Sequence, residues 1–201
     1  MFYAWACIPV FLGATLLAQS SNGTRKDLPT DKVESIPSPN GRWVLVATPS
    51  ETRTVTLVDK ESQKRALIKE YDRSLQIGWS PDSSAFFLND AYASNLEDAY
   101  VYFIAFGKPV LLNDYVLGHD SEAKSVAKKV DHAYFQVGNW TNAGTLLLEY
   151  CGHGGEAPGI QFDFIYKIDF RDFDSYAWRV EVKRVSRRLG PLSLPAPDCT
   201  F

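Results

Sequence analysis

A strand–turn–strand unit that recurs three times constrains the fold of this chain more than any other feature of its sequence. The copies begin at Ile36, Leu75 and Phe135. In the second and third copies, an apolar-Gln-apolar-Gly segment leads to a tryptophan, a polar turn and an apolar run, and the third copy has one extra residue, Asn139. Recurrence of one such unit predicts a series of β-hairpins that pack on one another.

The turns of the first two copies contain the residues that tight turns require. Ser-Pro-Asn-Gly begins at Ser38 and Ser-Pro-Asp-Ser begins at Ser80. Proline fixes φ at the second position, and Asn or Asp bonds to the local backbone. Pro39 and Pro81 lie 42 residues apart, which fits one four-stranded propeller blade. The runs that follow the three turns are apolar on both faces, as expected of strands buried between sheets, and comprise residues 43–47, 85–88 and 145–150.

The spacing between the second and third copies is longer, and the excess lies in residues 113–132. Asp120 or Ser121 is suited to cap a short helix there. Such a helix would place Ala123 and Val126 on one face and Lys124 on the other. We therefore predict one short helical insertion between these two units.

Four further segments have the pattern of strands: residues 52–58, 100–106, 161–170 and 178–183. In the third of them, one buried face is predicted to consist of Phe162, Phe164, Tyr166, Ile168 and Phe170. The last segment and the residues that follow it carry a basic cluster, which we interpret as the solvated face of an edge strand: Arg179, Lys183, Arg184, Arg187 and Arg188. The predicted fold class is all-β, with antiparallel blade-like sheets and the helical insertion.

Two of the units resemble blades of the TolB-like β-propeller family. WSPDSSAFFLND from Trp79, followed by DAYVYFI from Asp98, is similar to the family's turn-and-strand pattern, and so is SPNGRWVLV from Ser38. The likeness covers roughly residues 36–185. A closed propeller typically has four or more blades. With about three units, the resemblance implies a partial propeller, a sandwich-like packing of blades, or a subunit that completes a propeller by self-association.

The amino-terminal segment is typical of an exported protein. No charged side chain precedes Arg25, and residues 4–18 are almost wholly apolar. We interpret residues 1–20 as a signal peptide, with residues 2–18 as a single-span membrane anchor in the alternative. A linker is expected at 21–37, a β-propeller-like domain at 38–188 and a proline-rich tail at 189–201.

Composition and charge exclude two classes of protein. Aromatic residues make up 13% of the chain, which a disordered protein would not contain. The formal net charge of −3 excludes a nucleic-acid binder that works through bulk positive charge. We expect no cofactor, a partner that is another protein or an envelope component, and membrane contact only through an uncleaved amino-terminal segment.

A glycine-rich loop holds the chain's most unusual combination of side chains. In CGHGGEAPG, three residues are candidate metal ligands: Cys151, His153 and Glu156. The alternative is a flexible hairpin loop at a binding rim. His119 and His132 are distant in sequence and would join only through the fold. In an oxidising compartment Cys151 and Cys199 would form a disulfide, and otherwise they are two unrelated thiols.

The sequence contains no recognisable catalytic set. No Gly-x-Ser-x-Gly motif occurs, and the adjacent carboxylates Glu97 and Asp98 are expected to be solvated charges in a turn. The leading hypothesis is an exported, non-catalytic binding or scaffold protein with a contact rim at residues 90–98, 114–120 and 152–159. The alternatives are a metal-dependent enzyme that uses the loop from Cys151 to Glu156, and the self-associating structural subunit.

Overall fold

The computed structural model describes residues 25–29, 31–155, 159–174, 177–191 and 199, with only the backbone described at 172–174 and 177–178. These residues form thirteen strands and two helices. In chain order they are β1 Arg25–Leu28, β2 Glu34–Pro37, β3 Trp43–Thr48, β4 Arg53–Asp59, β5 Arg65–Tyr71, β6 Ser74–Trp79, β7 Ala85–Ala91, β8 Leu96–Phe103, β9 Lys108–Leu111, α1 Leu112–His119, α2 Ser121–Ala127, β10 His132–Asn142, β11 Thr145–Gly154, β12 Ile160–Asp174 and β13 Ala177–Pro191.

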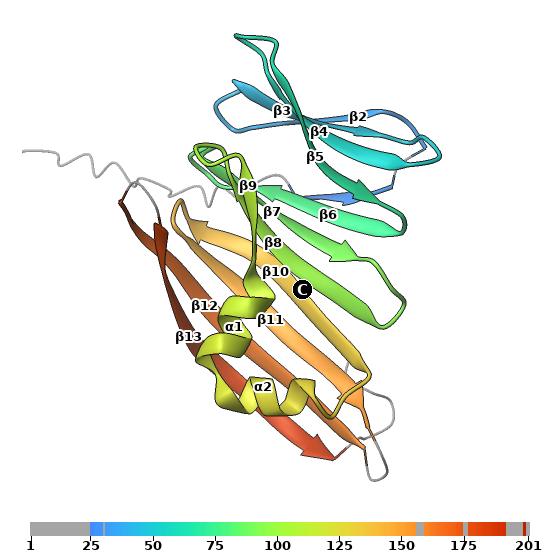
Figure 1. Ribbon diagram of the computed structural model, residues 1–201, viewed down its shortest axis with the longest axis vertical. Coiled ribbons are helices and arrows are strands. Elements are labelled where there is room, and N and C mark those ends of the chain that lie inside the picture. Colours follow the sequence, from blue (N-terminus) through green and yellow to red (C-terminus); the bar gives the residue numbers. More distant parts are fainter. Residues whose placement is uncertain (1–24, 30, 156–158, 175–176, 192–198, 200–201) are drawn as a thin grey trace, which may run out of the picture.

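The strands form three successive antiparallel meanders of four strands each (Figure 1). The first, β2–β5, is a separate sheet. The second, β6–β9, and the third, β10–β13, join with β1 into a nine-stranded sheet through a short parallel pairing of β8 with β10. Thirteen strands in largely antiparallel sheets, with only two short helices, confirm the predicted all-β class with antiparallel sheets. The described sheets do not close on themselves. The likeness to propeller blades and the self-association inferred from it stay predictions.

The first two turns share one hydrogen-bond network, which explains their similar sequences. The hydroxyl of Ser38 donates to Oδ1 of Asn40 at 2.8 Å and accepts from the amide of Trp43 at 3.0 Å. The same two bonds occur in the second turn, among Ser80, Asp82 and Ala85. The turns also touch, because the amide of Asn40 donates to the hydroxyl of Ser83 at 2.9 Å. Turn chemistry therefore fixes both the hairpins and their mutual packing.

In the second and third units, a buried indole donates a hydrogen bond to the backbone of the preceding unit. Nε1 of Trp79 donates to the carbonyl of Ile36 at 3.1 Å, and Nε1 of Trp140 donates to the carbonyl of Gly78 at 3.2 Å. Ile36 and Gly78 each lie two residues before the serine of their turn. The repeat seen in the sequence is therefore also a repeat of contacts.

The extra residue of the third unit is accommodated by a break in strand register. Val137 pairs with Leu148, but Asn139 already pairs with Leu147, so one residue of β10 has no partner on β11. Such an irregularity bends the strand locally. A second shift follows between Trp140 and Asn142.

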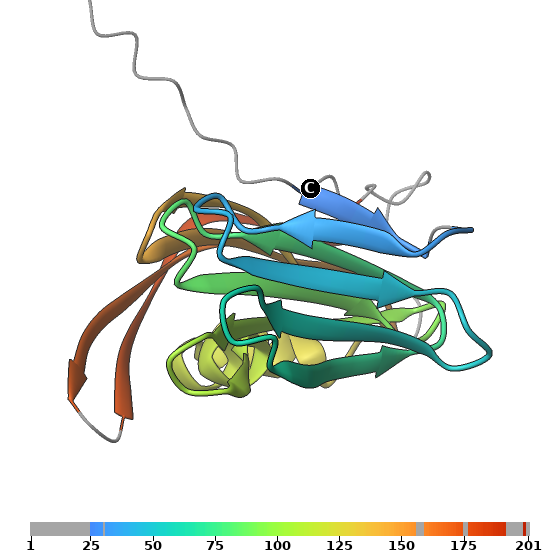
Figure 2. The ribbon, with the colours of Figure 1, turned by 90° about the horizontal axis from the view of Figure 1, so that it is seen from above.

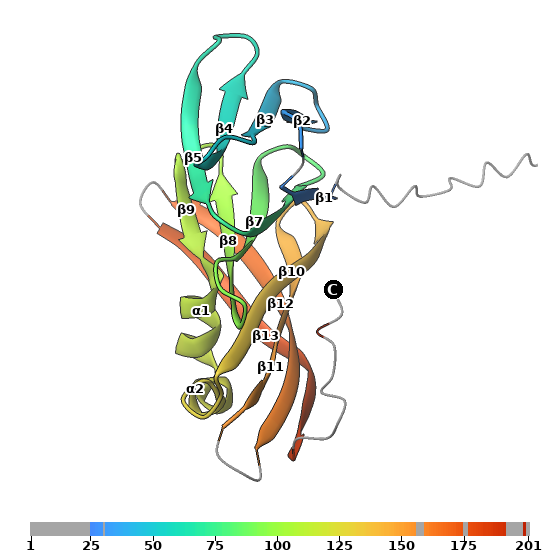
Figure 3. The same cartoon turned by 90° about the vertical axis from the view of Figure 1, so that its right-hand side faces the viewer.

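Two apolar cores hold the meanders together. One lies between β2–β5 and β6–β8 and contains Trp79 and Phe86. The other lies between β7–β8, β10–β13 and the helices, which cover one face of the sheet (Figure 3). The predicted buried face of β12 is confirmed, since every one of its five side chains is in this second core: Phe162, Phe164, Tyr166, Ile168 and Phe170.

The predicted helix is confirmed as α2. Oδ1 of Asp120 accepts from the amides of Glu122 and Ala123, and Ala123 and Val126 are buried. A further helix, α1, precedes it and was not expected. Its amino-terminal cap, Leu111, makes no side-chain capping bond, so the usual signal is missing from the sequence.

The ends of the predicted domain differ from expectation. Strands β1 and β2 lie within residues 21–37, where a linker was predicted, and β13 continues to Pro191 in the predicted tail. β13 is at the end of the sheet, so the predicted edge strand is confirmed. In Figure 2 the ends of β12 and β13 nearest their connection extend away from the other strands. The proposed signal or anchor at residues 1–20 lies outside the described residues.

Asn89 joins the second meander to the third, and its replacement tests this junction. Its Oδ1 accepts from the amide of Val137 at 2.8 Å and its Nδ2 donates to the Val137 carbonyl at 3.0 Å, while its side chain is buried. Asn89→Ala leaves both backbone groups without partners, so we expect a loss of about 3 kcal/mol in unfolding free energy, measured in urea. Asn142→Ala, at the exposed end of β10, is the control, and an equal effect of the two variants would contradict this role.

Candidate functional site

Where β8, β10 and β11 lie side by side, the large sheet has a polar face that the helices do not cover. Tyr134 of β10 pairs with Glu97 of β8 on one side and with Cys151 of β11 on the other. Gln136 pairs with Glu149. Because side chains alternate along a strand, these five share the face opposite the apolar core of Phe135 and Tyr150. A polar surface therefore crosses three neighbouring strands.

A pocket of about 410 Å³ opens on this polar face. Its walls come from segments far apart in the sequence and include Arg73, Ala91, Glu97, Tyr134, Gln136, His153 and Cys199. Two of the three rim segments predicted from sequence, residues 90–98 and 152–159, thus meet here. The third, 114–120, forms most of α1 on the other face of the sheet.

Glu97 is the most perturbed group in this pocket. Its side chain is half-buried, and burial raises the pKa of its carboxyl to about 7, although the amide of Gln136 and the charge of Arg25 oppose this rise. Nε2 of Gln136 donates to Oε2 of Glu97. Oε1 of Gln136 is buried and accepts no hydrogen bond from the described residues. The pocket therefore presents two adjacent acceptor groups that are poorly solvated.

The expectation that Glu97 and Asp98 are solvated turn charges is wrong. Both lie in β8, and burial raises the pKa of each. Asp98 is on the opposite face of the strand from Glu97 and accepts hydrogen bonds from Tyr100 at 3.3 Å and from Asn113 at 2.7 Å. Leu96 and Ala99 flank the two carboxylates and would have allowed a strand, but two adjacent charges are more typical of a solvated turn.

The glycine-rich segment from Cys151 places its candidate residues differently from a metal site. Cys151 and Cys199 form a disulfide, with a Cα–Cα distance of 6.0 Å, so Cys151 has no free thiolate. His153 is part of the pocket wall. Glu156 lies outside the described residues. The fold instead brings His132 directly opposite His153 on the neighbouring strand.

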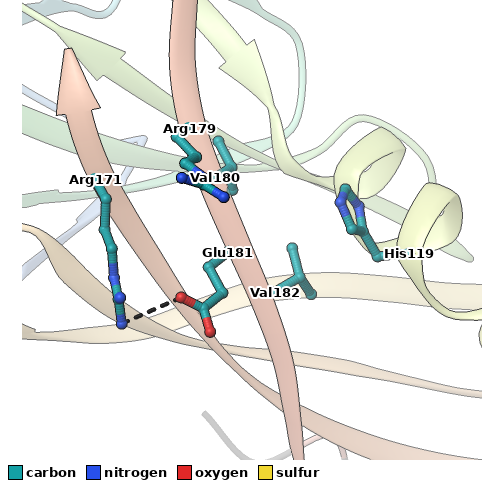
Figure 4. Close-up of a pocket in the computed structure, with 6 residues that line it drawn as sticks. All are labelled: His119, Arg171, Arg179, Val180, Glu181 and Val182. Atoms are coloured by element: carbon teal, nitrogen blue, oxygen red, sulfur yellow. Dashed lines mark ion pairs between the residues drawn. The ribbon is translucent and has the colours of Figure 1, made fainter.

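A second pocket, of about 480 Å³, lies between α1 and the outer strands (Figure 4). It contains His119 of α1 and the ion pair of Arg171 with Glu181, at 3.1 Å. The side chains of this pair are 59% and 54% exposed, so their charges are already matched and solvated. The Glu97 pocket is therefore the better candidate site, although it is smaller.

In the described ranges, no three or more His, Cys, Asp and Glu side chains gather so as to hold a metal ion. No described helix is both long and apolar enough to span a bilayer. Comparison of the chain with protein-family models, with curated proteins and with solved structures finds no match. The function must therefore be argued from the site itself.

Proposed function

We propose that this chain is an exported, non-catalytic binding protein whose Glu97 pocket receives an ammonium or guanidinium group of a protein or envelope partner. The observation that carries the proposal is the pair of poorly solvated acceptors, the Glu97 carboxyl and Oε1 of Gln136. A cationic N–H group would pair with both. Its charge would also favour the ionised form of Glu97 over the neutral form.

The size and position of the pocket support a binding role. A volume of about 410 Å³ is enough for a side chain or a small ligand. The walls belong to strands β8, β10 and β11 and to the segments beside them, so a rigid sheet positions the polar groups. Such pre-ordered groups suit recognition, since little freedom is lost on binding.

Export is supported by two independent features. The cysteine pair at disulfide distance is compatible with an oxidising compartment. The uncharged, apolar amino-terminal segment is typical of a signal peptide. The resemblance to TolB-like blades is consistent with the proposed role as a binding module, because blade loops commonly carry contact residues.

Charge reversal in the pocket tests the proposal. We expect the wild-type chain to retain a specific partner from the native envelope fraction, and Glu97→Lys to retain at least tenfold less of it, because two cations would then meet in a poorly solvated site. Glu51→Lys makes the same change at an exposed loop position and should retain the partner. Far-ultraviolet circular dichroism checks that each variant is folded.

Two results would count against the proposal. One is the absence of any specific partner for the wild type. The other is equal capture by Glu97→Lys and Glu51→Lys, which would show that binding does not involve the pocket. The milder Glu97→Gln variant removes the charge at nearly constant volume and should weaken capture in the same direction.

A further inference from the structure

His132 and His153 form a cross-strand pair at the edge of the polar face. They lie opposite each other on β10 and β11, with ring centroids 4.3 Å apart and ring planes 16° from parallel. We infer that this pair is a binding site for a transition-metal dication of the zinc, nickel and copper class, which it would bind after the stacked rings turn so that one nitrogen of each points at the ion. The site goes beyond the proposed function, because it needs no partner in the Glu97 pocket.

Tyr134 prepares His132 to act as a ligand. The Tyr134 hydroxyl donates its one proton to the carbonyl of Ser94, at 3.4 Å, and lies 3.1 Å from Nδ1 of His132. In the arrangement in which the hydroxyl proton goes to Ser94, Nδ1 of His132 is the donor in their contact. The lone pair of the neutral ring is then on Nε2, the atom left for a metal. Tyr134 is thus a positioning residue of the kind that commonly orients metal-binding histidines.

The backbone around His153 is built for close approach to β10. Gly152 and Gly154 flank His153, and a Cβ at Gly152 would collide with the carbonyl oxygen of His132. A Cβ at Gly154 would collide with Oδ1 of Asp131. The glycines therefore allow the two strands to bring the imidazoles together. They also allow the Asp131 carboxylate, one residue from His132, to lie against β11, where its charge would favour a bound dication.

The nature of the ligands selects the class of metal. Imidazole suits zinc, nickel and copper ions, whereas magnesium and calcium prefer oxygen ligands. Cys151 is held in the disulfide and supplies no thiolate. With two protein ligands, the remaining coordination positions go to water or to a solute. The site is therefore open and exchangeable, unlike a closed structural zinc site.

Calorimetric titration of the metal-stripped full chain with Zn²⁺ tests the inference. We expect one Zn²⁺ per chain, and at least about tenfold weaker binding in both His132→Ala and His153→Ala. His119→Ala is the matched control, since it removes the chain's third histidine from a separate element, and its affinity should be unchanged. Mg²⁺ should give no binding heat in any variant.

The site is refuted if the wild type takes up no Zn²⁺, if both pair variants retain wild-type affinity, or if His119→Ala loses as much as they do. His153→Gln and His132→Gln keep a polar side chain and must show the same loss of Zn²⁺ affinity should an alanine variant fail to fold.

Tyr134→Phe should weaken Zn²⁺ binding about tenfold, and an unchanged affinity would exclude its positioning role. Loss of partner capture would leave this titration unaffected, so the two proposals can fail separately.

Discussion

Replacing Cys199 with alanine is expected to lower the free energy of unfolding by about 4 kcal/mol. The disulfide closes a covalent loop, and in the chain-entropy model a loop of its size contributes about that much stability. The disulfide joins residues 48 positions apart. Cys151 lies within β11 and is buried, so the bond links Cys199, near the end of the chain, to an inner strand of the large sheet. Removing the link frees the unfolded chain more than the folded one.

Cys199→Ala is preferable to a change at Cys151 because it removes the bond without emptying space in the sheet. Urea unfolding under oxidising conditions gives the free energy, with Thr52→Ala as the control that shortens an exposed loop side chain away from the bond. Reducing agent should bring the wild type to the stability of Cys199→Ala. Two reactive thiols at Cys151 and Cys199 in the unreduced protein, or unchanged stability of Cys199→Ala, would contradict the expectation.

Much of the fold follows from local patterns in the sequence. Strict alternation along β12 reveals its buried face, because only a two-residue period places Phe162 and Phe170 on the same side. Asp120 marks the start of α2 because its carboxylate can cap the first turn. The extra Asn139 corresponds to a shift of register in β10. Each of these features depends on neighbours within a few residues.

The candidate site could not be predicted in the same way, because it depends on long-range register. An unbroken hairpin closed by Asn142 and Thr145 would place Gly155 opposite His132. Each of the two irregularities in β10 moves the pairing by one residue, and together they bring His153 there instead. The sequence shows one extra residue but does not say where the strand accommodates it.

Glu97 illustrates a second reason why the candidate site could not be predicted from the sequence. Its contact with Gln136 requires the parallel pairing of β8 with β10, which two helices separate in the chain. The charge beside it, Asp98, makes the dipeptide look like a solvated turn. Burial is a property of the assembled sheet, so a local reading of polarity misplaces both carboxylates.

Glu97→Gln is expected to make the protein more stable above neutral pH while leaving it nearly unchanged at pH 5. The folded-state pKa of Glu97 is raised from 4.5 to about 7, chiefly by burial. Between these values the folded protein keeps a proton that the unfolded chain has released. The stability that this proton contributes is fully present below the pKa of the unfolded state and is lost as pH rises through the pKa of the folded state. Allowing for partial solvent exposure, the loss is about 2 kcal/mol.

Glutamine has no proton to lose, so the variant should not show this decline. Urea unfolding at pH 5 and pH 8 measures the effect as the change in the stability difference between wild type and Glu97→Gln, and exposed Glu51→Gln serves as the control. A constant difference across this range would show that Glu97 titrates as an ordinary carboxyl. If the difference grows as expected while partner capture falls, the wild type keeps a destabilising ionised carboxyl at neutral pH because binding requires it, a trade-off common at functional sites.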